Sequence, residues 1–232
     1  MRLRFLGRGS GFSNDHTAAY FSTRNKEFVV IDCSVSAFQK LKNFDLSAYT
    51  DIYVLITHTH GDHIGGLGLF AQYAKFTLNR QITIVAPSHE VLNDLQTLLT
   101  IEGNDPSWYK LIHADALKYT YWFGHPTLTH HSPQLEGKCF GYHLLVNDVD
   151  VIYSGDTNTI KPYLPCLCGC AEFYVDVSVH YGMVHLKLSD ILDDLYALTK
   201  NGTHVYLMHL DDVKAAEKLI AGKSGIKIVP VE

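Results

Sequence analysis

Three histidines and one aspartate stand within six positions in the string THTHGDHIGG, which occupies residues 57–66. Imidazole nitrogens and carboxylate oxygens gathered this densely are typical of a metal site, and they suit Zn²⁺, with Mn²⁺ or Fe²⁺ as alternatives. Surface or helix-capping histidines are the simpler interpretation, but they do not account for the spacing. We therefore predict that this string binds metal.

The spacing of the string indicates two ions. The preceding run DIYVLIT predicts a buried strand, and alternate residues of extended chain point the same way, so His58 and His60 can bind one ion together. Gly61 allows a sharp turn, after which Asp62 and His63 can face a second ion. Two ions about 3.5–4 Å apart lower the pKa of a shared water and make it a nucleophile.

Further ligands must come from other strand ends, because one loop cannot complete two sites. The segments THHSPQ, YSGDTN and YLMHLDD offer them. We prefer His131 to His130, since adjacent strand residues face opposite ways and only one can point inward. The alternatives for the other two segments are a core histidine at His209 and a turn-forming residue at Asp156. Our assignment is His58, His60 and His131 on the first ion, Asp62, His63 and His209 on the second, and Asp156 bridging both.

The composition predicts a single soluble domain that spans residues 1–232. Hydrophobic residues make up 47% and charged residues 19%, which is ordinary for a globular protein. The net charge of -5, without a basic block, weakens the case for a nucleic-acid substrate without excluding it. An odd number of cysteines (five), no secretory signal and no run of 18 apolar residues predict a reducing, cytoplasmic location and no membrane partner.

Short β-branched and aromatic runs predict strands, and helical patterns lie between the later ones. The clearest helix runs from Leu188 to Leu198, with apolar residues at helical spacing and Gly202 beyond its end. Strands at both ends of the chain with helices between them predict a four-layer αββα sandwich of two mixed sheets flanked by helices. The predicted strands cover 3–7, 17–23, 27–33, 51–57, 82–88, 138–147, 150–156, 172–178, 204–210 and 226–231, and the weaker helices cover 36–44, 66–78, 89–102 and 212–221.

These motifs resemble those of the metallo-β-lactamase superfamily along nearly the whole chain. LRFLGRGSGF resembles the opening strand and glycine turn of its ribonuclease Z-like and small-phosphodiesterase branches, and THTHGDHIGG matches the superfamily signature. SGDT matches the bridging aspartate, and VYLMHL matches the strand with the last histidine. VVIDCS also matches, but Ser34 stands where glycine is usual, a departure that concerns the local turn. The implied fold is again the αββα sandwich.

Differences among the branches favour phosphodiester chemistry. Members that use two irons for redox work typically have Glu where His60 stands, and true β-lactamases lack the carboxylate that resembles Asp156. Glyoxalase II-like thioesterases usually carry Pro-Gly-His-Thr where this chain has His-His-Ser-Pro. The resemblance therefore favours the ribonuclease Z-like and small-phosphodiesterase branches.

A histidine before the clear helix is the expected catalytic residue of those branches. His185, in MVHLKLSD, resembles the histidine that lines the substrate phosphate, and Asp176 matches the acidic residue that orients it. The resemblance implies that His185 donates a proton or a hydrogen bond to the phosphate, and that Asp62 orients the hydroxide besides binding metal. The competing choice is His180, a solvated His185 is the simpler interpretation, and Tyr181 has no assigned role.

The expected substrate is small. Ribonuclease Z-like enzymes that process transfer RNA carry a long arm before the histidine equivalent to His131, whereas predicted helices and strands fill the interval from Ile64 to His130. We therefore predict a binuclear hydrolase that cleaves small phosphodiesters, cyclic nucleotides among them, by a metal-bound hydroxide. The alternatives are a transfer-RNA 3′-processing nuclease, a hydrolase of carboxylic esters, thioesters or lactones, and a metal-binding sensor without turnover. The sequence is compatible with a homodimer.

Two further patterns receive structural roles. Cys166, Cys168 and Cys170 alternate in PCLCGCAEF, and because the spacing differs from Cys-x-x-Cys we predict packing rather than a zinc or redox site. The run KYTYWFGHP, residues 118–126, predicts a two-faced strand rather than a base-stacking platform. If one face of that strand reached the mouth of the site, Tyr121 or Phe123 would stack on a nucleobase.

Overall fold

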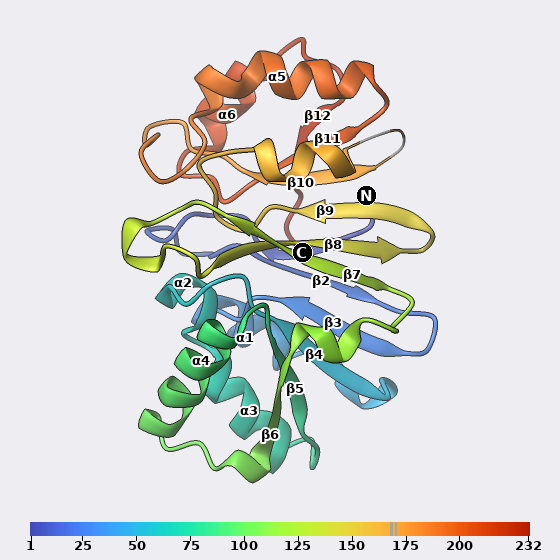
Figure 1. Ribbon diagram of the computed structural model, residues 1–232, viewed down its shortest axis with the longest axis vertical. Coiled ribbons are helices and arrows are strands. Elements are labelled where there is room, and N and C mark those ends of the chain that lie inside the picture. The colour runs from blue at the N-terminus through green and yellow to red at the C-terminus, as the bar shows by residue number, and fades with distance from the viewer. Residues whose placement is uncertain (168, 170) are drawn as a thin grey trace.

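Two six-stranded sheets pack face to face between two layers of helices in the computed structural model, which describes residues 1–167, 169 and 171–232 (Figure 1). The strand order is β1-β2-β3-β4-β5-β6 in the first sheet and β12-β11-β10-β9-β8-β7 in the second. Both sheets mix parallel and antiparallel pairs, so the predicted αββα sandwich is confirmed. Cys168 and Cys170 lie outside the described residues, so their predicted packing role stays a prediction.

The first sheet begins with antiparallel strands and continues with parallel ones. The pairs β1·β2 and β2·β3 are antiparallel, and β3·β4, β4·β5 and β5·β6 are parallel. Its central strands are almost continuous apolar runs, as expected for strands covered on both faces. The strands are β1 (Arg4–Gly7), β2 (Ala18–Ser22), β3 (Glu27–Ile31), β4 (Asp51–Leu55), β5 (Ile82–Ala86) and β6 (Tyr109–His113).

The second sheet repeats this plan. The pairs β7·β8 and β8·β9 are antiparallel, and β9, β10, β11 and β12 run parallel to one another. The parallel strands of both sheets have their carboxyl ends at one edge of the sandwich, where loops can collect side chains into a site. The strands are β7 (Phe123–Thr129), β8 (Cys139–Val146), β9 (Val149–Tyr153), β10 (Glu172–Asp176), β11 (His204–Met208) and β12 (Ile226–Ile228).

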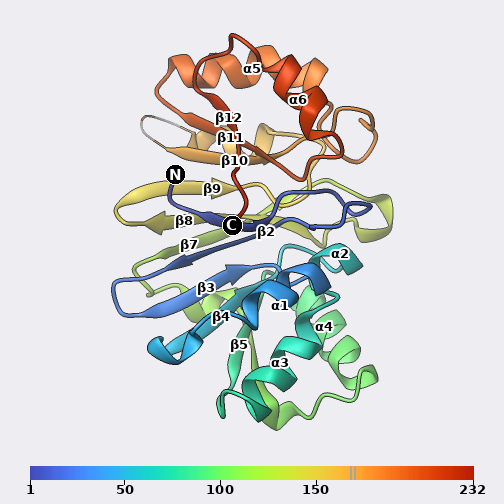
Figure 2. The same ribbon diagram turned by 180° about the vertical axis from the view of Figure 1, so that it is seen from behind.

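Helices cover the outer faces of both sheets, as the view from behind shows most clearly for α5 and α6 (Figure 2). The predicted helix that starts at Leu188 is confirmed as α5 and continues to Lys200, with its apolar stripe buried. The four weaker predicted helices correspond to α1, α3, α4 and α6, and each ends before its predicted last residue. The helices are α1 (Val35–Leu41), α2 (Gly61–Ile64), α3 (Leu67–Phe76), α4 (His89–Ile101), α5 (Leu188–Lys200) and α6 (Val213–Leu219), with short 3₁₀ turns η1 (Leu46–Ala48), η2 (Pro106–Trp108), η3 (Ala114–Leu117), η4 (Pro133–Leu135) and η5 (Lys161–Cys166).

Two local expectations need correction. The strand predicted over 118–126 is wrong for its first half, because β7 begins only at Phe123. Before it, the backbone N–H of Thr120 donates to the carbonyl of Leu117, and this turn replaces a strand ladder. The unusual Ser34 does not disturb its turn, since its side chain accepts a hydrogen bond from the N–H of Ala37 and caps α1.

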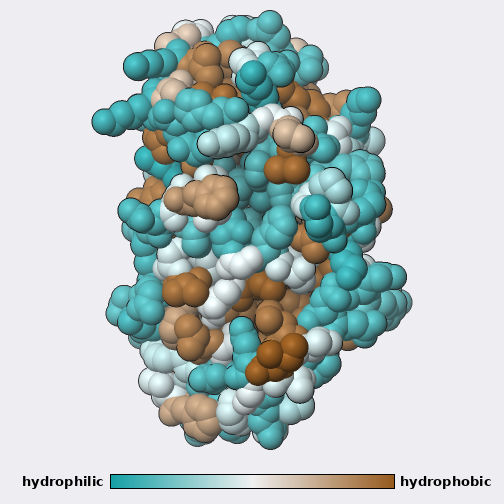
Figure 3. All heavy atoms as spheres, turned by 90° about the vertical axis from the view of Figure 1, so that its left-hand side faces the viewer, coloured by the Kyte–Doolittle hydropathy of each residue, from teal (hydrophilic) through white to brown (hydrophobic). Residues whose placement is uncertain are grey.

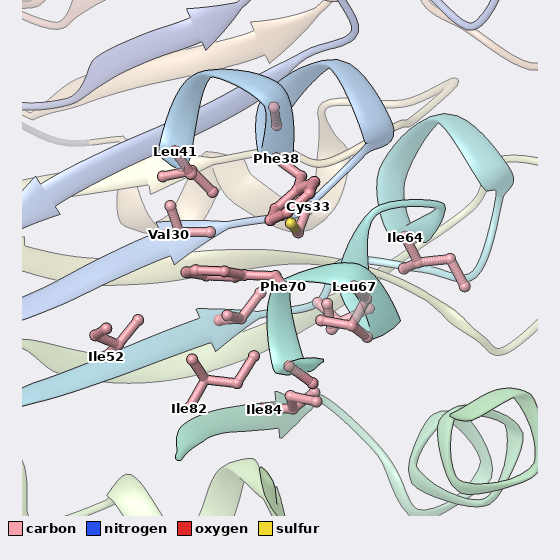
Figure 4. Packing of buried hydrophobic residues seen from close by; sticks show 14 of the residues in the cluster. Val30, Cys33, Phe38, Leu41, Ile52, Ile64, Leu67, Phe70, Ile82 and Ile84 are labelled. Carbon is pink, nitrogen blue, oxygen red and sulfur yellow. The ribbon is translucent and has the colours of Figure 1, made fainter. Parts of the chain in front are cut away.

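An apolar cluster between α1, α3 and the first sheet supports the loop that contains the histidine string. Leu67 and Phe70 project from α3 toward the strands, and Ile64 joins the same cluster from α2 (Figure 4). These side chains are almost completely buried. They fix the short helix α2, and with it Asp62 and His63, against the end of the sheet. No helix within the described part of the chain is both long enough and apolar enough to span a bilayer.

We expect Leu67→Ala to lower the free energy of unfolding by about 2–5 kcal/mol, because it opens a cavity in this cluster. Leu69→Ala is the matched control: Leu69 lies on the same helix with 44% of its surface exposed, and the change should cost less than about 1 kcal/mol. Urea unfolding monitored by circular dichroism measures both values. Equal losses for the two variants would contradict this description of the core.

Candidate metal centre

The predicted ligands meet at the edge of the sandwich where the parallel strands end. They come from loops of both sheets, which gather at the left of Figure 1, and Figure 3 shows that face from the front. Carboxyl ends of parallel strands are the usual place for a site in such sheets. His58 and His60 follow β4, Asp62 and His63 lie in α2, His131 follows β7, Asp156 follows β9, and His209 follows β11.

The first group of ligand atoms belongs to His58, His60, His131 and Asp156, and all of these atoms lie within 4.8 Å of one another. Nδ1 of His60 is 3.0 Å from Nε2 of His58 and 3.2 Å from Nε2 of His131. Two nitrogen ligands of one tetrahedral zinc ion are about 3.3 Å apart, given bonds of 2.0–2.1 Å. His60 therefore already lies at nearly the separation from His58 and from His131 that a shared ion requires.

The second group consists of Asp62, His63, Asp156 and His209. Nε2 of His63 lies 3.3 Å from Oδ1 of Asp156 and 3.4 Å from Oδ2 of Asp62. Nε2 of His209 lies 3.4 Å from Oδ2 of each of the two aspartates. Because Asp156 belongs to both groups, the structure brings together the same residues that the sequence assigned to each ion, with the same residue shared.

Hydrogen bonds fix the outward-facing nitrogen of two of these imidazoles, those of His131 and His63. Nδ1 of His131 donates to the carbonyl of Val184 at 2.7 Å, which leaves Nε2 to face Asp156. Nδ1 of His63 donates to Oδ2 of Asp32 at 2.8 Å. Such outer contacts set the tautomer and the ring orientation of metal-binding histidines, and they commonly change metal affinity 10- to 100-fold.

Asp32 contacts the candidate ligand His63, and no role was predicted for it from the sequence. Its carboxylate is completely buried and also accepts hydrogen bonds from the backbone N–H and the hydroxyl of Thr57, at 2.8 and 2.7 Å. Its backbone is left-handed, with φ 63°, and His209 is similar with φ 57°. The sequence does contain a signal for Asp32, because it is a charged residue at the end of the apolar run VVID. A carboxylate buried at such a place needs hydrogen-bond donors around it.

The structure also separates His131 from its neighbour. His130 points outward, where its Nδ1 lies 3.1 Å from Oε1 of Glu136 and 60% of its side chain is exposed. His131 turns inward and only 2% of its side chain is exposed. Of the two adjacent histidines, only His131 can therefore reach an ion at this site.

The donor set fits divalent cations. Burial alone would lower the pKa of His209, but the carboxylates of Asp156 and Asp176 raise it to about 10. Burial likewise opposes ionisation of Asp156, yet His209 and His63 hold the pKa of that carboxyl well below its usual value. Within the described residues, no hydrogen-bond partner reaches the buried Nε2 of His63, and none of those lining the cavity is Lys or Arg. Positive charge at this position must come from protonated histidines or from bound metal ions.

His185 lies beside both groups. Its ring centroid is 4.8 Å from those of His131 and His209, and its Nδ1 donates to Oδ2 of the buried Asp176 at 2.7 Å. Burial disfavours the imidazolium, but the charge of Asp176 outweighs it, and the pKa of His185 is raised. The competing His180 lies on the cavity rim, with its Nε2 3.3 Å from Asp212 and more than half of its side chain exposed.

A second contact that the sequence did not reveal is only partly buried and shapes the loop before His185. The carboxylate of Asp211 accepts hydrogen bonds from the hydroxyl of Ser178 and from the backbone N–H groups of Val179 and His180, at 2.6, 2.8 and 3.0 Å. Asp211 thereby ties the loop after β10 to the loop after β11. The partners are more than 30 residues apart, so no local pattern marks them.

The ligand groups open into a cavity of about 890 Å³. Its rim includes three exposed apolar side chains, Phe12 from the β1–β2 loop and Tyr181 and Met183 from the loop before His185. The face that bears this opening is largely hydrophilic, with separate apolar patches (Figure 3). The volume suits a small organic molecule and not a folded polymer.

Comparison with known proteins decides the family. A family model described as "Anti-Pycsar protein Apyc1" matches residues 1–227. The chain belongs to the Apyc1 family of anti-Pycsar proteins. The Apyc1 protein of Bacillus phage 010DV004 is 27% identical over 236 residues, which cover 91% of this chain and 90% of the relative. The Apyc1 protein of Paenibacillus sp. (strain J14) is 29% identical over 241 residues, with coverage of 91% and 90%.

Solved structures confirm the predicted superfamily fold for this Apyc1 family member. The metallo-β-lactamase fold protein YhfI of Bacillus subtilis matches with a TM-score of 0.74 and 15% identity, over 99% of this chain and 95% of its own. A diphosphatase of the PhnP family gives 0.71 and 17%, over 99% and 94%. Human short-form tRNase Z gives 0.63 and 16%, over 100% and 97%. The fold is therefore the metallo-β-lactamase fold.

The aromatic run at 118–126 does not reach this site. The hydroxyl of Tyr121 accepts a hydrogen bond from the N–H of Arg24 at 2.8 Å, at the turn between β2 and β3. Phe123 is buried in the core between the two sheets. Neither side chain reaches the mouth of the site, so neither can stack on a nucleobase bound there.

We expect His131→Ala to reduce the metal content of the purified protein by about one equivalent per chain, because it removes a ligand of one ion only. His130→Ala should leave the metal content unchanged, because that side chain points to solvent. Inductively coupled plasma mass spectrometry after growth in zinc-supplemented medium measures both. Equal metal contents in the two variants would remove His131 from the ligand set.

Proposed function

We propose that this chain is a metal-dependent phosphodiesterase and that its substrates are small phosphodiesters, with cyclic nucleotides as the favoured class. The observation that carries the proposal is the position of His185, which lies against both ligand groups and is held by the buried Asp176. A proton donor held beside two metal positions is the arrangement that displacement at phosphorus needs.

Different residues of the site can orient the attacking water and protonate the leaving group. Two divalent ions, most simply zinc, would supply an acidified water and Lewis-acid contacts to the phosphate oxygens. Oδ2 of Asp62 lies at the second ligand group, where it can accept a hydrogen bond from the attacking water and orient it. His185 donates Nδ1–H to Asp176, so its Nε2–H is directed at the departing oxygen. The proton that the leaving alkoxide requires therefore comes from His185.

The cavity supports a small substrate with a flat apolar part. Phe12, Tyr181 and Met183 surround its mouth with exposed apolar surface, which can pack against a nucleobase while the phosphate enters the histidine-rich floor. The absence of Lys and Arg from its described lining disfavours a long polyanion such as RNA. In the interval from Ile64 to His130, every residue of which is described, helices and strands leave no protruding arm.

The decisive assay compares substrate classes on the zinc-loaded protein. We expect turnover of bis-p-nitrophenyl phosphate and of 3′,5′-cyclic nucleotides, and none of precursor transfer RNA, a thioester, a lactone or a β-lactam. Chelation should abolish the activity, and re-addition of zinc should restore it. Thioester or lactone turnover without phosphodiester turnover would contradict the proposal, as would metal binding with no turnover at all, which supports a sensor.

In the same assay His185→Ala should lower kcat about 10²- to 10⁴-fold, the usual contribution of a positioned proton donor. His180→Ala is the control and should remain near the wild-type rate. The loss should be larger for a cyclic nucleotide than for a p-nitrophenyl ester, because the alkoxide is the poorer leaving group and needs the proton more. Equal rates for wild type and His185→Ala would exclude His185 as the donor.

The exposed apolar side chains at the rim of the cavity indicate how the substrate is held. We expect Phe12→Ala or Tyr181→Ala to raise KM for a cyclic nucleotide roughly 5- to 100-fold, since stacking on one base contributes about 1–3 kcal/mol. The reference substrate is ribose 3′,5′-cyclic phosphate without a base, for which KM should not change. Tyr119→Ala, at an exposed aromatic residue outside the cavity lining, is the control. A matching rise in KM for the base-free substrate would assign these side chains to the loop structure instead.

A further inference from the structure

A second cluster of metal-binding side chains lies on the outer face of the second sheet. His125 on β7 and His143 on β8 are paired directly in the antiparallel register, and Cys166 ends η5. One ligand atom from each of the three side chains lies within 4.8 Å of the others. Imidazole nitrogen and thiolate sulfur are the usual protein ligands of zinc.

A β-bulge brings the two histidines to the same face. Phe123 points into the core between the sheets, and strict alternation would point His125, two residues later, the same way. The register shifts between these two residues, so His125 faces outward beside His143, whose neighbours on β8 point inward. Gly124 forms the bulge, where a Cβ atom would lie only 2.8 Å from the carbonyl oxygen of His143. Bulges that redirect a side chain are common beside functional sites.

A carboxylate orients one of these histidines. Nε2 of His143 donates to Oδ1 of Asp150 on β9 at 2.7 Å, which leaves Nδ1 for a ligand. This is the carboxylate–histidine arrangement found behind metal-binding imidazoles.

We propose that His125, His143 and Cys166 bind a zinc ion that is separate from the proposed catalytic ions and fixes η5 to the sheet edge. About 13 Å of extended strand separates His125 from Thr129. Because Thr129 ends β7 just before His131, this site is distinct from the proposed catalytic centre. The three ligand atoms lie within 4.8 Å of one another, and tetrahedral zinc would require them to approach to about 3.3–3.6 Å by side-chain rotation. Water would be available for the fourth position, because His125 is exposed to solvent. Binding deprotonates the Cys166 thiol and releases that proton to solvent.

This site is compatible with the packing role predicted for Cys166. The side chain is half-buried and packs against the apolar cluster that lies under α5 and α6. A bound ion would add a cross-link between η5 and the β7–β8 pair. Because β7 is the edge strand of its sheet, that cross-link would also secure an edge with unpaired backbone groups.

Cobalt substitution tests the proposal directly on the full chain. The reduced protein, loaded with Co²⁺, should show thiolate-to-cobalt charge-transfer absorption in the near ultraviolet, which the histidine and aspartate ligands of the proposed catalytic centre cannot produce. Cys166→Ser should abolish this absorption and lower bound cobalt by one equivalent, and His143→Ala should do the same. Asp150→Asn should weaken cobalt binding about 10- to 100-fold.

Two controls separate this site from the rest of the molecule. His131→Ala should lose cobalt but keep the charge-transfer absorption, and His113→Ala, from a stacked pair with His89 elsewhere, should keep both. Phosphodiester turnover should be unchanged in Cys166→Ser. No thiolate absorption in the wild type, or absorption that persists in Cys166→Ser or His143→Ala, would overturn the proposal.

Discussion

A buried carboxylate at the end of β3 holds the centre together. Asp32 accepts hydrogen bonds from the backbone N–H and the hydroxyl of Thr57 and from Nδ1 of His63, so it ties the end of β3 to the segment after β4 and to α2. A buried charge is tolerated only when such partners surround it, and removal of one partner would leave the carboxylate without one of its hydrogen bonds. The ligands that follow β4 are therefore placed by a hydrogen-bonded network and not by loop packing alone.

The second sheet supplies the other half of the centre through a similar carboxylate. Asp176 binds His185 and the backbone N–H of Thr157, and its other oxygen lies 3.3 Å from Nδ1 of His209. The two sheets thus present buried aspartates from opposite sides, with Asp156 between the imidazoles. These buried carboxylates have two effects: they orient the histidines, and their negative charge favours bound cations.

The grouping of the proposed ligand residues could be predicted from sequence because their signal is local. His58, His60 and His63 lie in one string, and Asp156 and His209 each follow an apolar run that forms a parallel strand. Residues whose partners are distant in sequence could not be predicted: the bonds of Asp211 to the loop after β10 appear only when β10 and β11 are neighbours. The bulge at Gly124 was missed for a related reason, since alternation of residue types cannot show a shift in register.

The left-handed backbone conformation at Asp32 and His209 limits which residue types each position can accept. Glycine adopts that conformation without strain, but it has no side chain that could bind a metal or accept a hydrogen bond. β-Branched residues are strongly disfavoured there. Asn, Asp and His are the non-glycine residues that tolerate it best, so both positions already use members of this small set. Random substitution should therefore be accepted less often at these two residues than at the other buried side chains of the centre, since each must satisfy a backbone demand and a chemical demand at once.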